Sequence, residues 1–192
     1  MARTFVTSDT HFGHENIIRY ANRPFANWRM MGEAMIERWN SRVAADDVVY
    51  FLGDFAMGPG AKDDYVEQVL RRLNGDKIGV LGNHDQPSKW SVGLKQFVLE
   101  KGIDNFRILT DQIHAAKIDG VDFLMCHYPM VDWDGKFHGT VHLHGHAHTQ
   151  YRSKEVHNMV QSRRYDIGVD MFGGPVQVTG DLRFLNNPKG WE

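Results

Sequence analysis

Five short segments of this chain place Asp, Asn or His directly after an apolar run. The apolar run at residues 78–81 is followed by Gly82, Asn83, His84 and Asp85. A short apolar run bounded by turn residues is typical of a buried strand, so each polar cluster is expected where a strand ends. Five clusters at five strand ends predict one shared site. The other four segments are Asp9-Thr10-His11, Gly53-Asp54, Cys126-His127 and Gly145-His146-Ala147-His148.

The first half of the chain predicts strands that alternate with helices. Residues 4–7, 48–52 and 77–81 are rich in strand-forming or apolar residues and predict strands. Apolar residues at helical spacing predict a helix that begins near residue 15, and two more over 31–43 and 65–73. This succession implies parallel strands joined by helical crossovers, and ligands of such sheets collect beyond the carboxyl ends of the strands. Asp9, Asp54 and Asn83 all fall there.

The second half of the chain predicts shorter strands. Residues 113–118 and 121–126 flank the pair Asp119-Gly120, which is a strong hairpin signal. Further strands are expected at 141–144, 165–169 and 175–179, and we expect this half to form a second sheet with antiparallel pairs. There is no internal repeat and no linker rich in proline or serine. Residues 1–192 are therefore predicted to form a single two-sheet domain of the α/β class.

The composition argues against several classes of function. The 22 basic and 24 acidic side chains leave a net charge of -2, which gives no signal for a nucleic-acid partner or a membrane surface. We find neither the apolar core of a signal peptide nor a run long enough for a membrane helix. The only cysteine, Cys126, lies in an apolar run and is expected to be a buried thiol rather than a nucleophile. These features predict a cytoplasmic protein.

The five clusters offer ligands for metal ions. Their carboxylate, amide and imidazole groups suit divalent transition metals, with Mn favoured here and Fe, Ni or Zn as alternatives, better than they suit Ca. The chain has 11 histidines, and histidine is the commonest metal ligand. The clusters contain more ligand groups than one ion requires. Two ions about 3.5–4 Å apart need a bridging carboxylate and can share a hydroxide that attacks phosphorus, and Asp54 is the natural bridge.

In this order and spacing, the five clusters resemble the signature of the calcineurin-like metallophosphoesterases. The resemblance spans residues 9–148. It implies two facing mixed sheets flanked by helices, in an α-β-β-α sandwich, and it implies hydrolysis of phosphoester bonds. The small size is similar to that of the compact bacterial or phage-type members. The resemblance also implies one metal held by Asp9, His11, Asp54 and His148, and a second held by Asp54, Asn83, His127 and His146.

The same resemblance assigns His84 to catalysis. It would face the scissile phosphate and either protonate the leaving oxygen or stabilise the transition state. The chain departs from the protein Ser/Thr phosphatase branch, in which a second Asp and an Arg follow the bridging carboxylate. Here Asp54 is followed by residues 55–58, Phe-Ala-Met-Gly. The carboxylate that orients the histidine in that branch is therefore missing at the matching place, which leaves open what orients His84; Asp85 is one candidate.

Three residues near the first cluster are candidates for substrate contacts. His14 is expected to contact substrate or to support His11, in preference to being a plain loop residue. Arg19 and Arg23 could bind a substrate phosphate, because a guanidinium pairs well with phosphate oxygens. An exposed helical face explains both arginines equally well.

The loop at residues 128–139 leaves the predicted catalytic end of the sheet. Its Tyr128, Trp133 and Phe137 could rim the site and stack on a flat substrate group, with Trp133 as the main candidate. Inward packing of these aromatic side chains is a nearly equal alternative.

Several other polar residues are expected to be structural. His142 and His144 alternate within a predicted strand and are expected to lie in a satisfied polar interior. Asp170 is expected to end a strand. His114, His138 and His157 are expected to be structural or surface residues.

The leading hypothesis is therefore a dinuclear metal-dependent phosphoesterase with a small, nucleotide-like phosphodiester as the favoured substrate. An open site without a cap suits a diester, because both substituents need an exit. The alternatives are a phosphomonoesterase or a nuclease on the same metal core, or a catalytically silent binding scaffold. A silent scaffold is expected to have lost ligands, and none is missing here.

Overall fold

The first of two sheets contains the strands predicted in the first half of the chain. The computed structural model describes residues 2–87, 93–148, 163–186 and 190–191. Its first sheet has the strand order β4-β3-β2-β1-β9, in which β1 to β4 are parallel and β9 is antiparallel to β1. The strands are β1 (Thr4–Thr7), β2 (Val48–Phe51), β3 (Asp76–Gly79), β4 (Phe106–Ile108) and β9 (Val176–Gln177).

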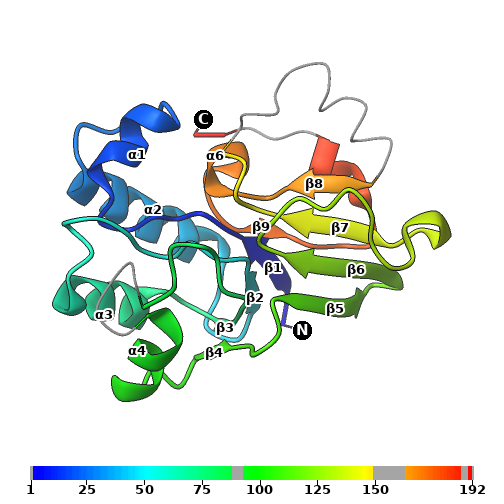
Figure 1. The fold of residues 1–192 in the computed structure, drawn as a ribbon, viewed down its shortest axis with the longest axis horizontal. Helices are drawn as coiled ribbons and strands as arrows, with labels where there is room; N and C mark the ends of the chain where they lie inside the picture. The colour runs from blue at the N-terminus through cyan, green and yellow to red at the C-terminus, as the bar shows by residue number, and fades with distance from the viewer. Residues whose placement is uncertain (1, 88–92, 149–162, 187–189, 192) are drawn as a thin grey trace.

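The helices that connect these strands pack on one side of the first sheet (Figure 1). Met31, Met35 and Trp39 recur at helical spacing on the second of them and are buried against the sheet. Each such side chain contributes about 1.5–3 kcal/mol by leaving water. The helices are α1 (Glu15–Tyr20), α2 (Trp28–Arg42), α3 (Asp63–Arg72) and α4 (Leu94–Glu100).

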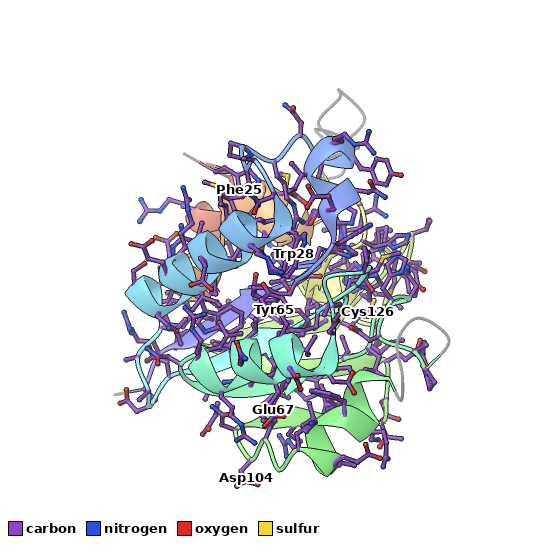
Figure 2. All side chains as sticks on the ribbon, turned by 90° about the vertical axis from the view of Figure 1, so that its left-hand side faces the viewer. Phe25, Trp28, Tyr65, Glu67, Asp104 and Cys126 are labelled. Carbon is purple, nitrogen blue, oxygen red and sulfur yellow. The ribbon has the colours of Figure 1, made fainter. Side chains whose placement is uncertain are left out.

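Two of these helices also contact each other through aromatic side chains. Figure 2 looks onto the helical layer and shows Trp28 of α2 above Tyr65 of α3, with their ring centroids 4.8 Å apart in an edge-to-face arrangement. Asn27 caps the start of α2, since its side chain accepts a hydrogen bond from the backbone N–H of Met30. In the described part of the chain, no helix combines the length and apolarity needed to cross a bilayer.

The second sheet has the order β5-β6-β7-β8 and corrects one expectation. Only the hairpin of β5 and β6 is antiparallel, whereas β6, β7 and β8 run parallel. The hairpin turns at Asp119 and Gly120, whose φ angles of 47° and 82° suit a two-residue turn. The last predicted strand belongs to the first sheet as β9. The strands are β5 (Ile113–Ile118), β6 (Val121–Cys126), β7 (Val141–His144) and β8 (Arg164–Asp166).

The two sheets face each other across an apolar layer, and helices flank them, as the resemblance implies. Val6 of the first sheet and Leu52, directly after β2, belong to the same buried cluster as Phe123, Met125 and Leu143 of the second. Loops that follow strands of the two sheets meet, since Nδ1 of His127 contacts the carbonyl of Leu52 and the backbone N–H of His146 donates to Asp9. The remaining short elements are η1 (Lys136–His138), α6 (Val169–Phe172) and η2 (Leu182–Asn186).

Candidate metal centre

The loops that leave β1 and β2 stay paired beyond the strands. The backbone N–H groups of Asp9 and His11 donate to the carbonyls of Gly53 and Asp54, at 3.0 and 3.1 Å. The two loops therefore advance side by side and bring the side chains of their first polar residues together.

Five of the predicted metal ligands have left-handed backbone conformations. A non-glycine residue with positive φ costs energy and is found where the surroundings force it, most often at functional sites. The φ angles fall between 45° and 69° for Asp9, His11, Asp54, His146 and His148. This concentration of strain indicates that the chain holds these side chains in place for a purpose other than folding.

The carboxylate of Asp85 fixes the backbone of the loops after β2 and β3. It is buried and accepts hydrogen bonds from the backbone N–H groups of Asp54, Phe55 and Gly82, at 2.7, 2.9 and 2.8 Å. A β-carbon at Gly82 would overlap the Asp54 carboxylate. The close approach of these two loops therefore requires glycine at position 82.

One group of ligands contains Asp9, His11 and His148. The Nε2 atoms of the two histidines lie 3.1 Å apart. A carboxylate oxygen of Asp9 lies 3.7 Å from Nε2 of His148. The Nδ1 of His148 lies 2.9 Å from an oxygen of Asp170, so it must donate its proton there. In the neutral ring this leaves the Nε2 lone pair directed at the other two ligands.

A second group contains Asn83, His127 and His146. The amide oxygen of Asn83 lies 3.0 Å from Nε2 of His127 and 3.0 Å from Nδ1 of His146. The Nδ1 of His127 donates to the carbonyl of Leu52 at 2.8 Å, which again leaves Nε2 as the ligand atom.

Asp54 lies between the two groups. One of its carboxylate oxygens is 3.5 Å from Nε2 of His11 and 3.5 Å from Nε2 of His127. An ion about 2.1 Å from each of its ligands separates neighbouring ligand atoms by roughly 3.0–3.4 Å. The observed separations are close to these values, and Asp9, Asp54 and His127 also form a cluster able to hold an ion. The residues fit metal ions in both groups.

The protonation of His11, His127 and Asp9 agrees with this fit, whereas the pKa of His148 is raised, because its burial is outweighed by its hydrogen bond to Asp170 and by the charges of Asp9 and Asp170. Burial lowers the pKa of His11 well below its ordinary value and also lowers that of His127, so both rings are neutral at pH 7 and can bind metal. Burial raises the pKa of Asp9 to about 8, and the nearby carboxylates of Asp166 and Asp54 add to this shift, which the charge of His148 and the hydrogen bond of Ser8 offset only in part. A bound cation favours the ionised carboxylate, and its binding would release the proton of Asp9.

His84 lies at the edge of the ligand groups. Its Nε2 is 4.0 Å from Asp54, its ring packs edge-on against His11, and its side chain is 23% exposed. The prediction that Asp85 orients His84 is wrong, because the Asp85 carboxylate is used by three backbone N–H groups. The Nδ1 of His84 is buried without a hydrogen-bond partner in the described structure.

Arg23 and Asp170 differ from their predicted roles. The guanidinium of Arg23 is fully buried and forms two hydrogen bonds with the carboxylate of Asp170, at 2.7 and 2.9 Å. It also donates to the backbone carbonyls of Asp9 and Thr10. Arg23 is therefore not placed to bind substrate, and Asp170 lies in the first turn of helix α6 instead of ending a strand. Sequence reasoning missed the contact of Asp170 with His148, since no local pattern connects them.

Trp133 is also not placed to bind substrate. It is 8% exposed, donates its indole N–H to the carbonyl of Thr140 and packs on His142. The inward-packing alternative holds for this residue, whereas Tyr128 is 44% exposed and its ring packs against that of His146.

The other histidine predictions are confirmed where the structure describes them. His142 and His144 are buried, and each has a ring nitrogen within hydrogen-bond distance of a backbone carbonyl. His114 is partly buried in β5 and His138 is exposed. His157 lies outside the described residues.

His14 and α1 border a cleft beside the ligands. His14 is 8% exposed, and its ring lies 5.5 Å from that of His11. Arg19 is exposed on α1 and donates to the side chain of Asn16, which lines the cleft.

Two facing sheets with clustered metal ligands at their strand ends define a metal-dependent hydrolase of phosphoric esters. The model of the calcineurin-like phosphoesterase family matches residues 2–167. The chain belongs to this family, and it is a phosphoesterase that binds divalent metal ions.

Similar chains occur in archaea, phages and bacteria. An uncharacterized protein of Methanocaldococcus jannaschii is 31% identical over 171 residues, which cover 89% of this chain and 82% of the relative. The gene 66 protein of Mycobacterium phage L5 is 26% identical, over 90% of this chain and 89% of its own length. The crystal structure of a protein of unknown function from Aquifex aeolicus has a TM-score of 0.69 and 23% identity, over 92% of this chain and 96% of the other, and so shares the fold.

Proposed function

We propose that the chain is a dinuclear phosphodiesterase that uses two divalent transition-metal ions, preferably Mn. The observation that carries this proposal is the position of Asp54, whose carboxylate lies within 3.5 Å of a histidine from each ligand group. Asp9, His11 and His148 would hold one ion, and Asn83, His127 and His146 would hold the other, with Asp54 shared. The ions, when bound, polarise phosphate oxygens and lower the pKa of coordinated water.

The protein's own groups supply the remaining steps. His84 is adjacent to Asp54 without belonging to either ligand group, so its ring can face the phosphoryl group. In its protonated form it donates a proton to the oxygen of the leaving alcohol. Asp85 and the paired loops hold the ligands rigidly, so little reorganisation is needed when the substrate binds.

A second feature supports a phosphodiester over a monoester. Separate clefts border the two ligand groups: one of about 460 Å³ beside His11 and His148, and one of about 170 Å³ beside His127 and Tyr128. A diester has two substituents, and each cleft can take one of them. Arg23 is committed to Asp170, so it cannot help enclose the extra oxygen of a monoester. A small, nucleotide-like diester fits these features.

The location proposed for the protein is the cytoplasm. Cys126 is buried and its thiol donates to the carbonyl of Tyr128, while burial raises the pKa of the thiol. A single protected thiol without a disulfide partner is usual in a reducing compartment.

The substrate preference can be tested with chromogenic esters. We expect the Mn-loaded protein to show a higher kcat/KM for bis(4-nitrophenyl) phosphate than for 4-nitrophenyl phosphate. Asp54→Asn is the matched control, because it changes one charge at the shared ligand and should abolish activity on both esters. A higher kcat/KM for the monoester would contradict the proposed diester preference.

A further inference from the structure

The cleft between α1 and the ligands is the larger of the two that border the metal centre. One side of it is formed by His11, His84 and His148, which belong to the centre itself. Ile17 and Tyr20 of α1 also line the cleft, together with Met57 from the loop after β2. Its volume of about 460 Å³ lies within the range of small-molecule sites.

The side of the cleft away from the metal centre is apolar and aromatic. Ile17 is buried, whereas Tyr20 keeps 73% of its surface exposed although it is a large aromatic residue. The ring of Tyr20 stands nearly perpendicular to that of His14, with centroids 6.4 Å apart, and most of the Tyr20 side chain remains accessible. An exposed aromatic face beside a catalytic centre is suited to stacking on a flat group.

The described lining of the cleft also lacks side chains with a permanent charge. None of the described residues that line it is a lysine, arginine, aspartate or glutamate. Arg19 hydrogen-bonds Asn16 but is not one of the lining residues. No lysine or arginine of this described lining would replace the hydration lost by a leaving group that carried further phosphates.

His84 gives the cleft its role in the reaction. Its ring borders the cleft on one side and lies 4.0 Å from the shared carboxylate of Asp54 on the other. The substituent whose oxygen receives a proton from His84 must extend past this ring, and the cleft is the space beyond it.

We propose that this cleft binds the leaving alcohol of the diester, that the alcohol is uncharged and carries a flat aromatic or heteroaromatic group, and that Tyr20 stacks on that group. The inference rests on the proposed phosphodiesterase function and adds the substrate class and a residue that determines specificity. The second substituent then occupies the cleft beside Tyr128.

Two phosphonates distinguish binding at the metal centre from binding in the cleft. Methylphosphonate presents a phosphoryl group alone, whereas phenylphosphonate adds a flat ring to it. We expect calorimetric titration of the Mn-loaded protein to show tighter binding of phenylphosphonate. Tyr20→Ala should weaken the binding of phenylphosphonate roughly tenfold, a change that corresponds to about 1.4 kcal/mol. The same variant should leave the affinity for methylphosphonate unchanged.

Two further variants serve as controls. Tyr20→Phe keeps the ring and should retain the affinity for phenylphosphonate. Leu99→Ala removes an apolar side chain that is 68% exposed and does not line the cleft, so it should change neither affinity. Circular dichroism and metal content that match the wild type establish that each variant is folded and loaded.

The outcomes distinguish the inference from the function on which it rests. Phenylphosphonate binding that Tyr20→Ala leaves within twofold of the wild type overturns the assignment of the cleft. Failure of the wild-type, Mn-loaded protein to bind either phosphonate overturns the proposed function, and the cleft assignment falls with it.

Discussion

The buried pair of Arg23 and Asp170 supports one side of the metal centre. Asp170 accepts hydrogen bonds from the guanidinium and from Nδ1 of His148, while Arg23 also binds the backbone carbonyl of Asp9. Both side chains are at most 2% exposed. Burial alone would raise the pKa of Asp170, but the charge of Arg23 and the hydrogen bonds outweigh it, so the pKa is lowered and the carboxylate stays ionised. We expect Asp170→Ala to damage stability and metal binding together.

The expected magnitudes follow from this geometry. Removing one partner of a buried ion pair costs about 3–5 kcal/mol, because the other charge stays buried without compensation. Domains of this size are stable by only about 5–15 kcal/mol, so the loss is large. Losing the hydrogen bond that orients His148 should also weaken metal binding by roughly 10–100-fold.

An exposed ion pair of the same protein is a matched control. Glu33 and Arg72 form two hydrogen bonds of 2.6 and 2.7 Å, but their side chains are 60% and 46% exposed. Solvent screens such a pair, and Glu33→Ala should cost no more than about 1 kcal/mol.

Urea unfolding of the metal-free chains measures both losses in free energy, provided that the m-values agree. Metal must be absent, since ions bound to the folded state would add stability of their own. Manganese titration of the same variants then gives the loss of affinity. The supporting role assigned to the buried pair is refuted by two results together. Asp170→Ala would lower the free energy of unfolding no more than Glu33→Ala does, and it would bind manganese with the affinity of the wild type.

Two further predictions concern catalysis and pH. His84→Ala should keep its metal content and lose roughly 10²–10⁴-fold in kcat, the range for an acid-base or transition-state group; loss of metal would show that His84 is a ligand. The hydrogen bonds of Arg3 lower the pKa of Asp47 from 3.8 to about 2. Because the folded-state pKa is the lower one, this stabilisation is complete above about pH 4 and is lost as the pH falls towards 2. Asp47→Asn should therefore be less stable than the wild type at pH 6, and the difference should shrink below pH 4; a constant difference would contradict the assignment.

The clustering of the candidate metal ligands could be predicted from the sequence because its signal is local. Asp9, Asp54 and Asn83 each follow an apolar run, and the topology of parallel strands brings such positions to one edge of the sheet. The hairpin around Asp119 and Gly120 was predictable for a similar reason, since its turn residues lie between two strand-forming segments.

The elements that sequence reasoning missed or misassigned depend on contacts between distant segments. Arg23 and Asp170 are 147 residues apart in the sequence. The residues around Arg23 alone do not distinguish a buried arginine from one on the surface. Strand β9 has two residues and joins β1 of the first sheet, which no local pattern encodes. Helix α4 and the three-residue strand β4 were also not predicted, since short elements gain their stability from packing.

The direct test of the dinuclear claim is the metal content of the purified protein. After loading with manganese and dialysis, elemental analysis should give about two ions per chain for the wild type. Asp54→Asn should retain fewer ions, because it weakens the ligand shared by both groups. A wild-type protein that saturates at one ion per chain, with full activity at that ratio, would contradict the proposed centre.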